Sequence, residues 1–368
     1  MSYGTEAAAL DDDVLRVIGR WRRGRPLDDA AFDDLALRIF AHQLRYNAAY
    51  ARYCGSLGVT LRALPATWAE IPPVPASAYK EATLATFDPA RSALAFTTSG
   101  TTQDVGGRHY METSALYDAA LLAAFDRFVL ADGLQLRYLN LVPNPHDRPE
   151  SSLGYMMARV ASARGDGETG WYVRGDDLFF DAFVNDVRAA SARAVPVCIA
   201  TTAFALVHVL DLCSRDDVRF ALPPGSRIME TGGFKGRSRA VSRDELYAES
   251  ARRFGLAREA IFAEYGMTEL SSQYYDAVDS RNRATRVKAS PPWLRPRVVG
   301  PDGKTLAPGT VGALAHVDLA NRSSCVALLT EDLGLEVDGG IVLIGRERGA
   351  ALRGCSLDAQ ELRAALHA

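Results

Sequence analysis

The sequence predicts an α/β fold with a largely parallel sheet, preceded by a helical segment and followed by a small β-rich region. From about residue 93, short apolar runs alternate with amphipathic helical stretches, which is the pattern of repeated βαβ units. After about residue 295, turn signals separate short stretches, as in antiparallel β structure. The 368 residues, 48% of them hydrophobic, suffice for one large domain or two.

The N-terminal region predicts helices between residues 11 and 55. In the second of them, side chains recur at steps of three and four, so they lie on one stripe that packs into a core. The stripe contains Phe32, Leu35, Ile39, Gln43, Tyr46, Tyr50 and Tyr53. Gly55 is the expected C-cap, because glycine readily adopts the left-handed conformation found there. We therefore expect residues 1–92 to form a helical segment packed on the core.

Residues 93–345 are expected to form the core domain, with a short tail at residues 346–368. Its strands are expected at residues 93–96, 136–142, 194–200, 226–230 and 260–263, each a stretch of strand length that contains apolar residues. Ser151 and Ser152 precede an apolar helical stretch and are expected to cap it. The Asp-Gly-Gly sequence at residues 338–340 predicts a β-hairpin.

Composition and charge exclude several classes of protein. The formal net charge is −3, from 42 basic and 45 acidic residues, so no basic field is available to bind a nucleic acid. The five cysteines form no CxxC pair, and their odd number argues against a disulfide framework. The start of the chain lacks the features of a signal peptide, and no stretch reaches the ~18 apolar residues of a membrane span. We expect a cytoplasmic protein with no membrane span and no nucleic-acid partner.

A hydroxyl-rich segment follows the first predicted strand. Residues 96–103 read Phe-Thr-Thr-Ser-Gly-Thr-Thr-Gln, and five of these eight side chains carry a hydroxyl group. Backbone N–H groups freed at a glycine turn, together with hydroxyl donors, can bind phosphate oxygens. The segment is not a Walker A loop, because no Gly-Lys-Ser/Thr follows it. The alternative interpretation is a polar surface loop.

Two further polar segments follow later strands. Residues 263–269 read Ala-Glu-Tyr-Gly-Met-Thr-Glu, which supplies a ring that can stack on a purine and a carboxylate that can bind Mg²⁺. Residues 329–334 place Asp332 in a predicted loop, where its carboxylate can accept hydrogen bonds from ribose hydroxyls, and Arg346 follows. The alternatives are a turn or a helix cap for Asp332 and a surface ion pair for Arg346.

These three segments, in this order, resemble the nucleotide motifs of the adenylate-forming superfamily, which includes acyl-CoA synthetases, peptide-synthetase adenylation domains and luciferases. The resemblance extends from about residue 93 to the C-terminus. The chain is more closely similar to the acyl-protein synthetases of the fatty-acid reductase system of bacterial bioluminescence. This similarity rests on the compact length, the Tyr-Gly-Met-Thr-Glu motif, and residues 152–156 (Ser-Leu-Gly-Tyr-Met), 231–235 (Thr-Gly-Gly-Phe-Lys) and 353–357 (Arg-Gly-Cys-Ser-Leu).

The resemblance implies an adenylate-forming large domain and an ATP- and Mg²⁺-dependent ligase that makes an acyl-adenylate. It assigns the phosphates of ATP to one loop, formed by Thr98, Ser99, Gly100, Thr101 and Thr102. It implies that Thr268 contacts the α-phosphate and that Glu269 binds Mg²⁺.

The same resemblance implies where the nucleoside binds. Gly232 and Gly233 would lie against the adenine, and Tyr265, next to Gly266, would stack on it. Asp332 would bind the ribose, with Arg346 assisting.

The resemblance also implies a second step that uses a cysteine. Cys355 matches the acceptor cysteine of acyl-protein synthetases by its local context, so it would receive the acyl group of a fatty or related carboxylic acid as a thioester. The group would then pass to a partner protein of the reductase or acyltransferase type. Two alternatives stay open. One is an adenylating ligase that uses CoA, a carrier protein or an amine, and the other is a catalytically degenerate relative that binds nucleotide.

The sequence departs from the superfamily pattern at two places. Residues 103–109 lack the lysine that usually follows the phosphate loop, which leaves Arg108 as a possible replacement. The chain stops soon after Arg346, so we expect the full C-terminal lid domain to be absent. His146 lies in a predicted loop, where it either lines the acyl entrance or is structural.

Overall fold

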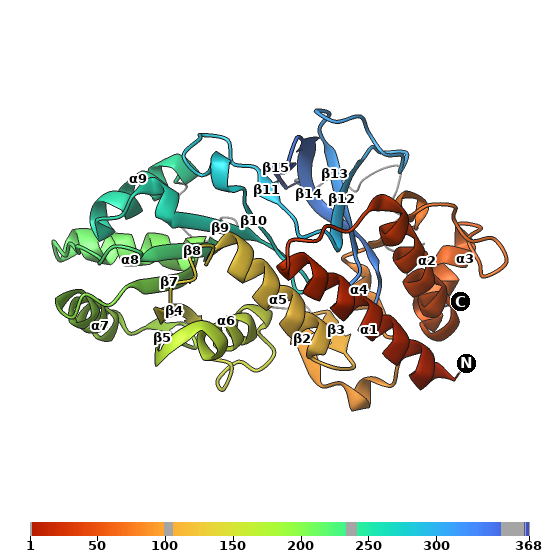
Figure 1. Ribbon diagram of the computed structural model, residues 1–368, viewed down its shortest axis with the longest axis horizontal. Helices are drawn as coiled ribbons and strands as arrows, with labels where there is room; N and C mark the ends of the chain where they lie inside the picture. Colours follow the sequence, from red (N-terminus) through yellow and green to blue (C-terminus); the bar gives the residue numbers. More distant parts are fainter. Residues whose placement is uncertain (1, 99–105, 233–240, 347–363, 365, 368) are drawn as a thin grey trace. The chain divides into compact units, whose positions relative to one another are not determined.

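The chain folds into two compact units, each assembled from separate stretches of the sequence (Figure 1). The computed structural model describes residues 2–98, 106–232, 241–346, 364, 366 and 367. The first unit comprises Met1–Ala123, Met267–Gln273 and Val287–Ala368. The second unit comprises Ala124–Gly266 and Tyr274–Arg286.

The first unit combines N-terminal helices with C-terminal strands. Its helical elements are α1 (Tyr3–Arg22), α2 (Asp29–Tyr46), α3 (Ala48–Ser56), η1 (Trp68–Glu70), α4 (Ala78–Glu81), η2 (Pro89–Arg91) and the start of α5 (Ala115–Phe128). Its strands are β1 (Val74–Pro75), β2 (Leu94–Thr97), β3 (Arg108–Met111), β11 (Lys288–Ala289), β12 (Leu294–Val299), β13 (Gly312–Asp318), β14 (Ala327–Val337) and β15 (Gly340–Arg346).

The second unit alternates strands and helices. Its strands are β4 (Leu136–Pro143), β5 (Gly165–Arg174), β6 (Asp177–Leu178), β7 (Val197–Thr202), β8 (Arg227–Thr231), β9 (Ile261–Tyr265) and β10 (Tyr274–Asp276). Its helical elements are α6 (Ser152–Arg164), α7 (Phe180–Ala192), α8 (Ala203–Arg215), α9 (Arg243–Phe254), η3 (Arg258–Ala260) and η4 (Val278–Ser280).

The N-terminal helices depart from the predicted single stripe at Asn47. The backbone there is extended, and the Asn47 side chain accepts a hydrogen bond from the Tyr50 N–H, so it ends α2 and caps α3. Its amide group also donates to the Ser324 carbonyl oxygen, which fixes the break by a distant contact. The predicted C-cap at Gly55 is wrong, because α3 continues through that residue and Leu57 is the C-cap.

Parallel strands form the sheet of the second unit. The strand order is β10-β9-β8-β7-β4-β5-β6, in which β9, β8, β7, β4 and β5 run parallel. Alternate side chains of β4 point to opposite faces. Leu139 and Leu141 pack in the core formed with α7, α8 and α9, whereas the Tyr138 ring contacts Phe125 of α5. Helices therefore pack against both faces, as a parallel sheet requires (Figure 1).

Antiparallel pairing dominates the strands of the first unit. Their order is β12-β13-β14-β15-β11, and β1 pairs with β14 in parallel. Asp338 and Gly339 form the two-residue turn between β14 and β15, which confirms the predicted hairpin. Gly339 has a φ of 82°, a conformation that favours glycine. β2 and β3 form a separate antiparallel hairpin.

The architecture confirms the predicted α/β class, with helices first and a β-rich region late in the chain. The predicted strands correspond to β2, β4, β7, β8 and β9. β7 begins at Val197 rather than at residue 194, because Pro196 has no N–H to donate. Ser151 caps α6 as expected, since its side chain accepts from the Gly154 N–H. The domain boundaries at residues 92 and 345 stay a prediction.

Candidate active site

The base of the predicted phosphate loop lies on the β2–β3 hairpin. Thr97 pairs with Arg108, and the Thr98 N–H donates to the Gly107 carbonyl oxygen at 2.8 Å. Gly106 is required for this closure, because a Cβ atom there would lie 2.7 Å from the Thr98 carbonyl oxygen. The hairpin therefore brings the two ends of the loop together.

Thr98 and Arg108 are placed differently at this base. Thr98 is buried, and its hydroxyl oxygen has no hydrogen-bond partner among the described residues. Arg108 is exposed on β3. A substitute for the usual lysine needs a cation that is free to reach a ligand, and the exposed Arg108 side chain meets that requirement.

His109 links β3 to the Tyr-Gly-Met-Thr-Glu segment. Its side chain is fully buried, and its Nδ1 atom lies 2.7 Å from the Thr268 carbonyl oxygen. Burial lowers the pKa of His109 to about 4, so the ring is neutral near pH 7. A carbonyl oxygen can only accept, and the neutral ring therefore carries its proton on Nδ1. No local sequence pattern indicates a role for His109, because its partner lies 159 residues away in the chain.

Buried polar side chains also hold the residues that follow Thr268. The Asn321 amide group donates to the Glu269 carbonyl oxygen at 2.9 Å. The Asp318 carboxylate accepts from the Ser271 N–H at 3.0 Å and from the Ser272 hydroxyl group at 2.8 Å. Burial raises the pKa of Asp318 to about 6. Residues 269–272 are thus fixed by two buried side chains, Asp318 at the end of β13 and Asn321 in the turn after it.

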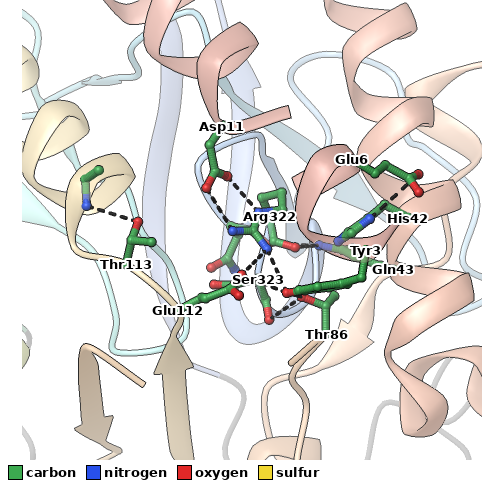
Figure 2. Close-up of polar contacts among 12 residues, drawn as sticks. Tyr3, Glu6, Asp11, His42, Gln43, Thr86, Glu112, Thr113, Arg322 and Ser323 are labelled. Carbon is green, nitrogen blue, oxygen red and sulfur yellow. Dashed lines mark hydrogen bonds and ion pairs between the residues drawn. The ribbon is translucent and has the colours of Figure 1, made fainter. Parts of the chain in front are cut away.

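The turn that carries Asn321 is itself anchored to the N-terminal helices. The Gln43 amide group of α2 donates to the carbonyl oxygens of Asn321 and Arg322, at 2.9 and 3.0 Å. Figure 2 shows the Arg322 guanidinium group between Asp11 of α1 and Glu112. Arg322 forms two bonds to Asp11, at 2.7 and 2.9 Å, and one to Glu112 at 2.9 Å. Helix packing and the candidate catalytic segment are therefore connected.

Asp332 and Arg346 lie on neighbouring strands, so the prediction of a loop at Asp332 is wrong. Asp332 is in β14 and faces Arg346 of β15 in the strand register. Asp332 is 9% exposed, and its N–H donates to the Thr330 hydroxyl group. The strand register places the two residues opposite each other, and their joint binding of a ribose stays a prediction.

In the second unit, the adenine residues predicted from sequence lie at the carboxyl ends of parallel strands. Gly232 follows β8 and Tyr265 ends β9, and Thr231 pairs with Glu264 between these strands. Ligands of open α/β sheets commonly bind at this edge. Gly232 has a φ of 86°, and a Cβ atom there would meet no atom of the described residues within 4 Å. Backbone conformation, rather than crowding, therefore explains the glycine.

Glu264 is a second residue that sequence reasoning missed at this edge. It is buried, and its carboxylate accepts a hydrogen bond from the Thr231 hydroxyl group. The Tyr265 ring lies beside Tyr274, with 5.6 Å between the ring centres. The sequence signal for Glu264 is its position directly before Tyr265. Its negative charge does not by itself indicate a partner on β8.

His146 lies in the loop that follows β4, at the same carboxyl edge of the parallel strands. Its side chain is exposed, and its backbone N–H donates to the Asn144 side chain. This position is compatible with either of the two interpretations of His146.

Sequence comparison identifies the family. A sequence model of the acyl-protein synthetase family LuxE matches residues 26–362. The chain belongs to the acyl-protein synthetase family. A curated relative, the long-chain-fatty-acid–luciferin-component ligase of Vibrio harveyi, is 24% identical over 335 residues, which cover 86% of this chain and 84% of that protein.

Solved structures show the same fold as this acyl-protein synthetase family member. 2-Hydroxyisobutyryl-CoA ligase with 2-HIB-AMP has a TM-score of 0.64 and 14% identity, over 87% of this chain and 69% of that chain. McyG A-PCP with phenylalanyl-adenylate has a TM-score of 0.51 and 20% identity, over 71% of this chain. ATP-bound MatB from Rhodopseudomonas palustris has a TM-score of 0.51 and 16% identity, also over 71%. This chain spans about half of the last two, at 48% and 49%.

The family match confirms the predicted acyl-protein synthetase family, and the solved structures confirm the predicted fold. Several predicted site residues lie outside the described ranges: Ser99, Gly100, Thr101, Thr102, Gly233 and Cys355. The other four cysteines, Cys54, Cys198, Cys213 and Cys325, are buried, as expected for core residues. Burial raises the pKa of each of these thiols, which disfavours the reactive thiolate form.

Glu269 offers one carboxylate, which fits Mg²⁺ bound jointly with a nucleotide. Among the described residues, no group of three or more His, Cys, Asp or Glu side chains could hold a metal ion. Mg²⁺ is commonly bound by one or two carboxylates together with substrate phosphates, so a single carboxylate is compatible with this mode.

Within the same described ranges, no helix has the length and apolar character needed to cross a membrane.

Proposed function

We propose that this acyl-protein synthetase family member uses ATP to activate a carboxylic acid as an acyl-adenylate. The observation that supports this most directly is the contact between His109 and Thr268. Through it, the base of the hydroxyl-rich loop lies beside the Thr268–Glu269 segment within the first unit. Two of the three sequence segments with nucleotide-binding character therefore meet.

In the proposed reaction, a carboxylate oxygen of the acid attacks the α-phosphorus of ATP. The new oxygen–phosphorus bond forms as the bond to the β-phosphate oxygen breaks, and pyrophosphate leaves with that electron pair. Thr268 binds the α-phosphate, and Glu269 holds Mg²⁺, which neutralises phosphate charge. Asp332 and Arg346 bind the ribose, and Tyr265 stacks on the adenine. These residues act by positioning and charge stabilisation.

The second proposed step transfers the acyl group to Cys355. The thiolate attacks the acyl carbonyl carbon, the new carbon–sulfur bond forms, and AMP leaves with the electron pair of the broken anhydride bond. The name of the Vibrio harveyi relative supports a long-chain fatty acid as the substrate class. The acyl group then passes to a partner protein of the reductase or acyltransferase type in the cytoplasm.

The proposal is tested by ATP–pyrophosphate exchange across a series of carboxylic acids, with and without Mg²⁺. We expect exchange with medium- or long-chain acids and its loss on chelation of Mg²⁺. Mass spectrometry after incubation with ATP and acid should detect an acyl adduct on Cys355 that neutral hydroxylamine releases. Cys355→Ala should retain exchange and lose the adduct. Exchange without a cysteine adduct, but with product formed on added CoA, would favour the rival ligase.

A further inference from the structure

Two consecutive backbone carbonyl groups in the candidate active site are held by buried side chains. The Thr268 carbonyl oxygen lies 2.7 Å from His109 Nδ1. The next carbonyl oxygen, that of Glu269, accepts from Asn321 Nδ2 at 2.9 Å. Both side chains are almost fully excluded from solvent, with exposed fractions of 0% and 1%. Buried hydrogen bonds of this kind fix a backbone segment firmly, because breaking one leaves a buried polar group unpaired.

The two donors are themselves oriented by other contacts. The His109 ring packs edge-on against the Tyr79 ring, at 5.6 Å between ring centres. Asn321 also donates to the Cys325 carbonyl oxygen at 2.9 Å and accepts from the Ser271 hydroxyl group at 2.8 Å. Neither side chain can therefore rotate away without losing further contacts. His109, the partner of the Thr268 carbonyl group, lies on the β2–β3 hairpin, and Asn321, the partner of the Glu269 carbonyl group, lies in the turn after β13.

We propose that His109 and Asn321 are positioning residues for adenylation, which orient Thr268 and Glu269 through their carbonyl groups. This inference rests on the proposed function. Neither residue touches ATP or the metal in this scheme. His109 couples the orientation of Thr268 to the hairpin whose loop binds the phosphates, so the two phosphate contacts keep a fixed relation. A displacement of about 1 Å at a catalytic group can cost 10²-fold in rate.

The test uses purified full-length protein and ATP–pyrophosphate exchange. His109→Leu removes the donor and keeps a similar side-chain volume. His109→Asn keeps an N–H donor, because Asn Nδ2 is separated from Cα by the same number of bonds as His Nδ1. His42→Leu is the matched control, because His42 is also fully buried but lies on α2 among Tyr3 and Tyr46. We expect kcat to fall roughly 30- to 100-fold in His109→Leu and to recover to within about fivefold in His109→Asn.

Further readouts separate positioning from packing. His42→Leu should keep the wild-type kcat even if it melts earlier. Asn321→Leu should lower kcat about as much as His109→Leu, with the KM for ATP changed much less than kcat. In ¹⁵N-histidine NMR spectra, one neutral ring with its proton on Nδ1 should be present in the wild type and absent from His109→Asn.

Two outcomes of the kinetic measurements would overturn the inference while leaving the proposed function intact. One is a wild-type kcat in His109→Leu, and the other is an equal loss of kcat in the leucine and asparagine variants. In the NMR spectra, a His109 ring that carries its proton on Nε2 alone would also overturn the inference. If the wild type catalyses no exchange with any acid while the NMR signature is present, the proposed function fails, and the role in adenylation fails with it.

Discussion

The strand ends of the second unit and the Thr268–Glu269 segment of the first unit place their residues by different means. Gly232 follows β8 and Tyr265 ends the adjacent parallel strand β9, so both lie at one edge, where backbone hydrogen bonds set the register. Residues 267–273 form neither helix nor strand, and side chains from distant parts of the chain hold them. An irregular segment therefore depends on particular buried polar side chains, whereas a strand end depends mainly on the sheet.

The largest expected effect comes from removing Arg322, which anchors the turn that holds residues 269–272. Arg322→Ala leaves the Asp11 and Glu112 carboxylates without their buried partner, and it should lower the free energy of unfolding by about 3–5 kcal/mol. Arg16→Ala is the control, since Arg16 pairs with Asp13 on the surface and should cost at most about 1 kcal/mol. Urea unfolding curves compare the two. Equal stability of both variants would show that the buried cluster does not support the segment.

Removal of the proposed metal ligand should come next in size. Glu269→Gln removes a negative charge while the backbone contact to Asn321 is kept, so exchange should fall by roughly two orders of magnitude or more. Melting temperature should change little, because the Glu269 side chain is half-exposed. Glu259→Gln, an exposed position on η3, is the control. Unchanged exchange in Glu269→Gln would contradict the Mg²⁺ assignment.

Asp332 tests whether strand register also positions a ligand-binding residue in the first unit. Asp332→Ala should raise the KM for ATP about tenfold, the scale of a lost hydrogen bond to a charged group. Its neighbour Glu331 is exposed and points to the other face of β14, so Glu331→Ala should leave that KM unchanged. Parallel measurement of melting temperature separates binding from stability. An unchanged KM in Asp332→Ala would remove it from the ribose site.

The smallest expected effect concerns the strand end itself. Gly232→Ala places a Cβ atom in open space but in a left-handed conformation, so it should destabilise the protein by about 1–2 kcal/mol. Gly4→Ala is the matched control, because its Cβ atom also meets no described residue within 4 Å but its backbone is helical. Thermal unfolding distinguishes them. If both substitutions behave alike, backbone conformation is not the reason for Gly232.

Much of the fold could be predicted from local sequence patterns. The apolar runs of β4 and β9, the Ser151 cap of α6 and the Asp338-Gly339 turn each reflect interactions among residues close in sequence. Residue order also placed Gly232 and Tyr265 near strand ends, because each lies two residues after a predicted strand. Such features have a period of two or 3.6, or a turn chemistry, that a single sequence displays.

Only the tertiary structure decided the contacts that join distant segments. His109 and Thr268 are 159 residues apart, and Arg322 and Asp11 are 311 residues apart. Asn47 illustrates the same point, since the α2–α3 break is fixed partly by its bond to the Ser324 carbonyl oxygen. Asp332 lies in a strand because β15 pairs with β14 there, although the local sequence predicts a loop. A hydrogen bond between segments depends on how both pack, and no periodicity within either segment encodes that packing.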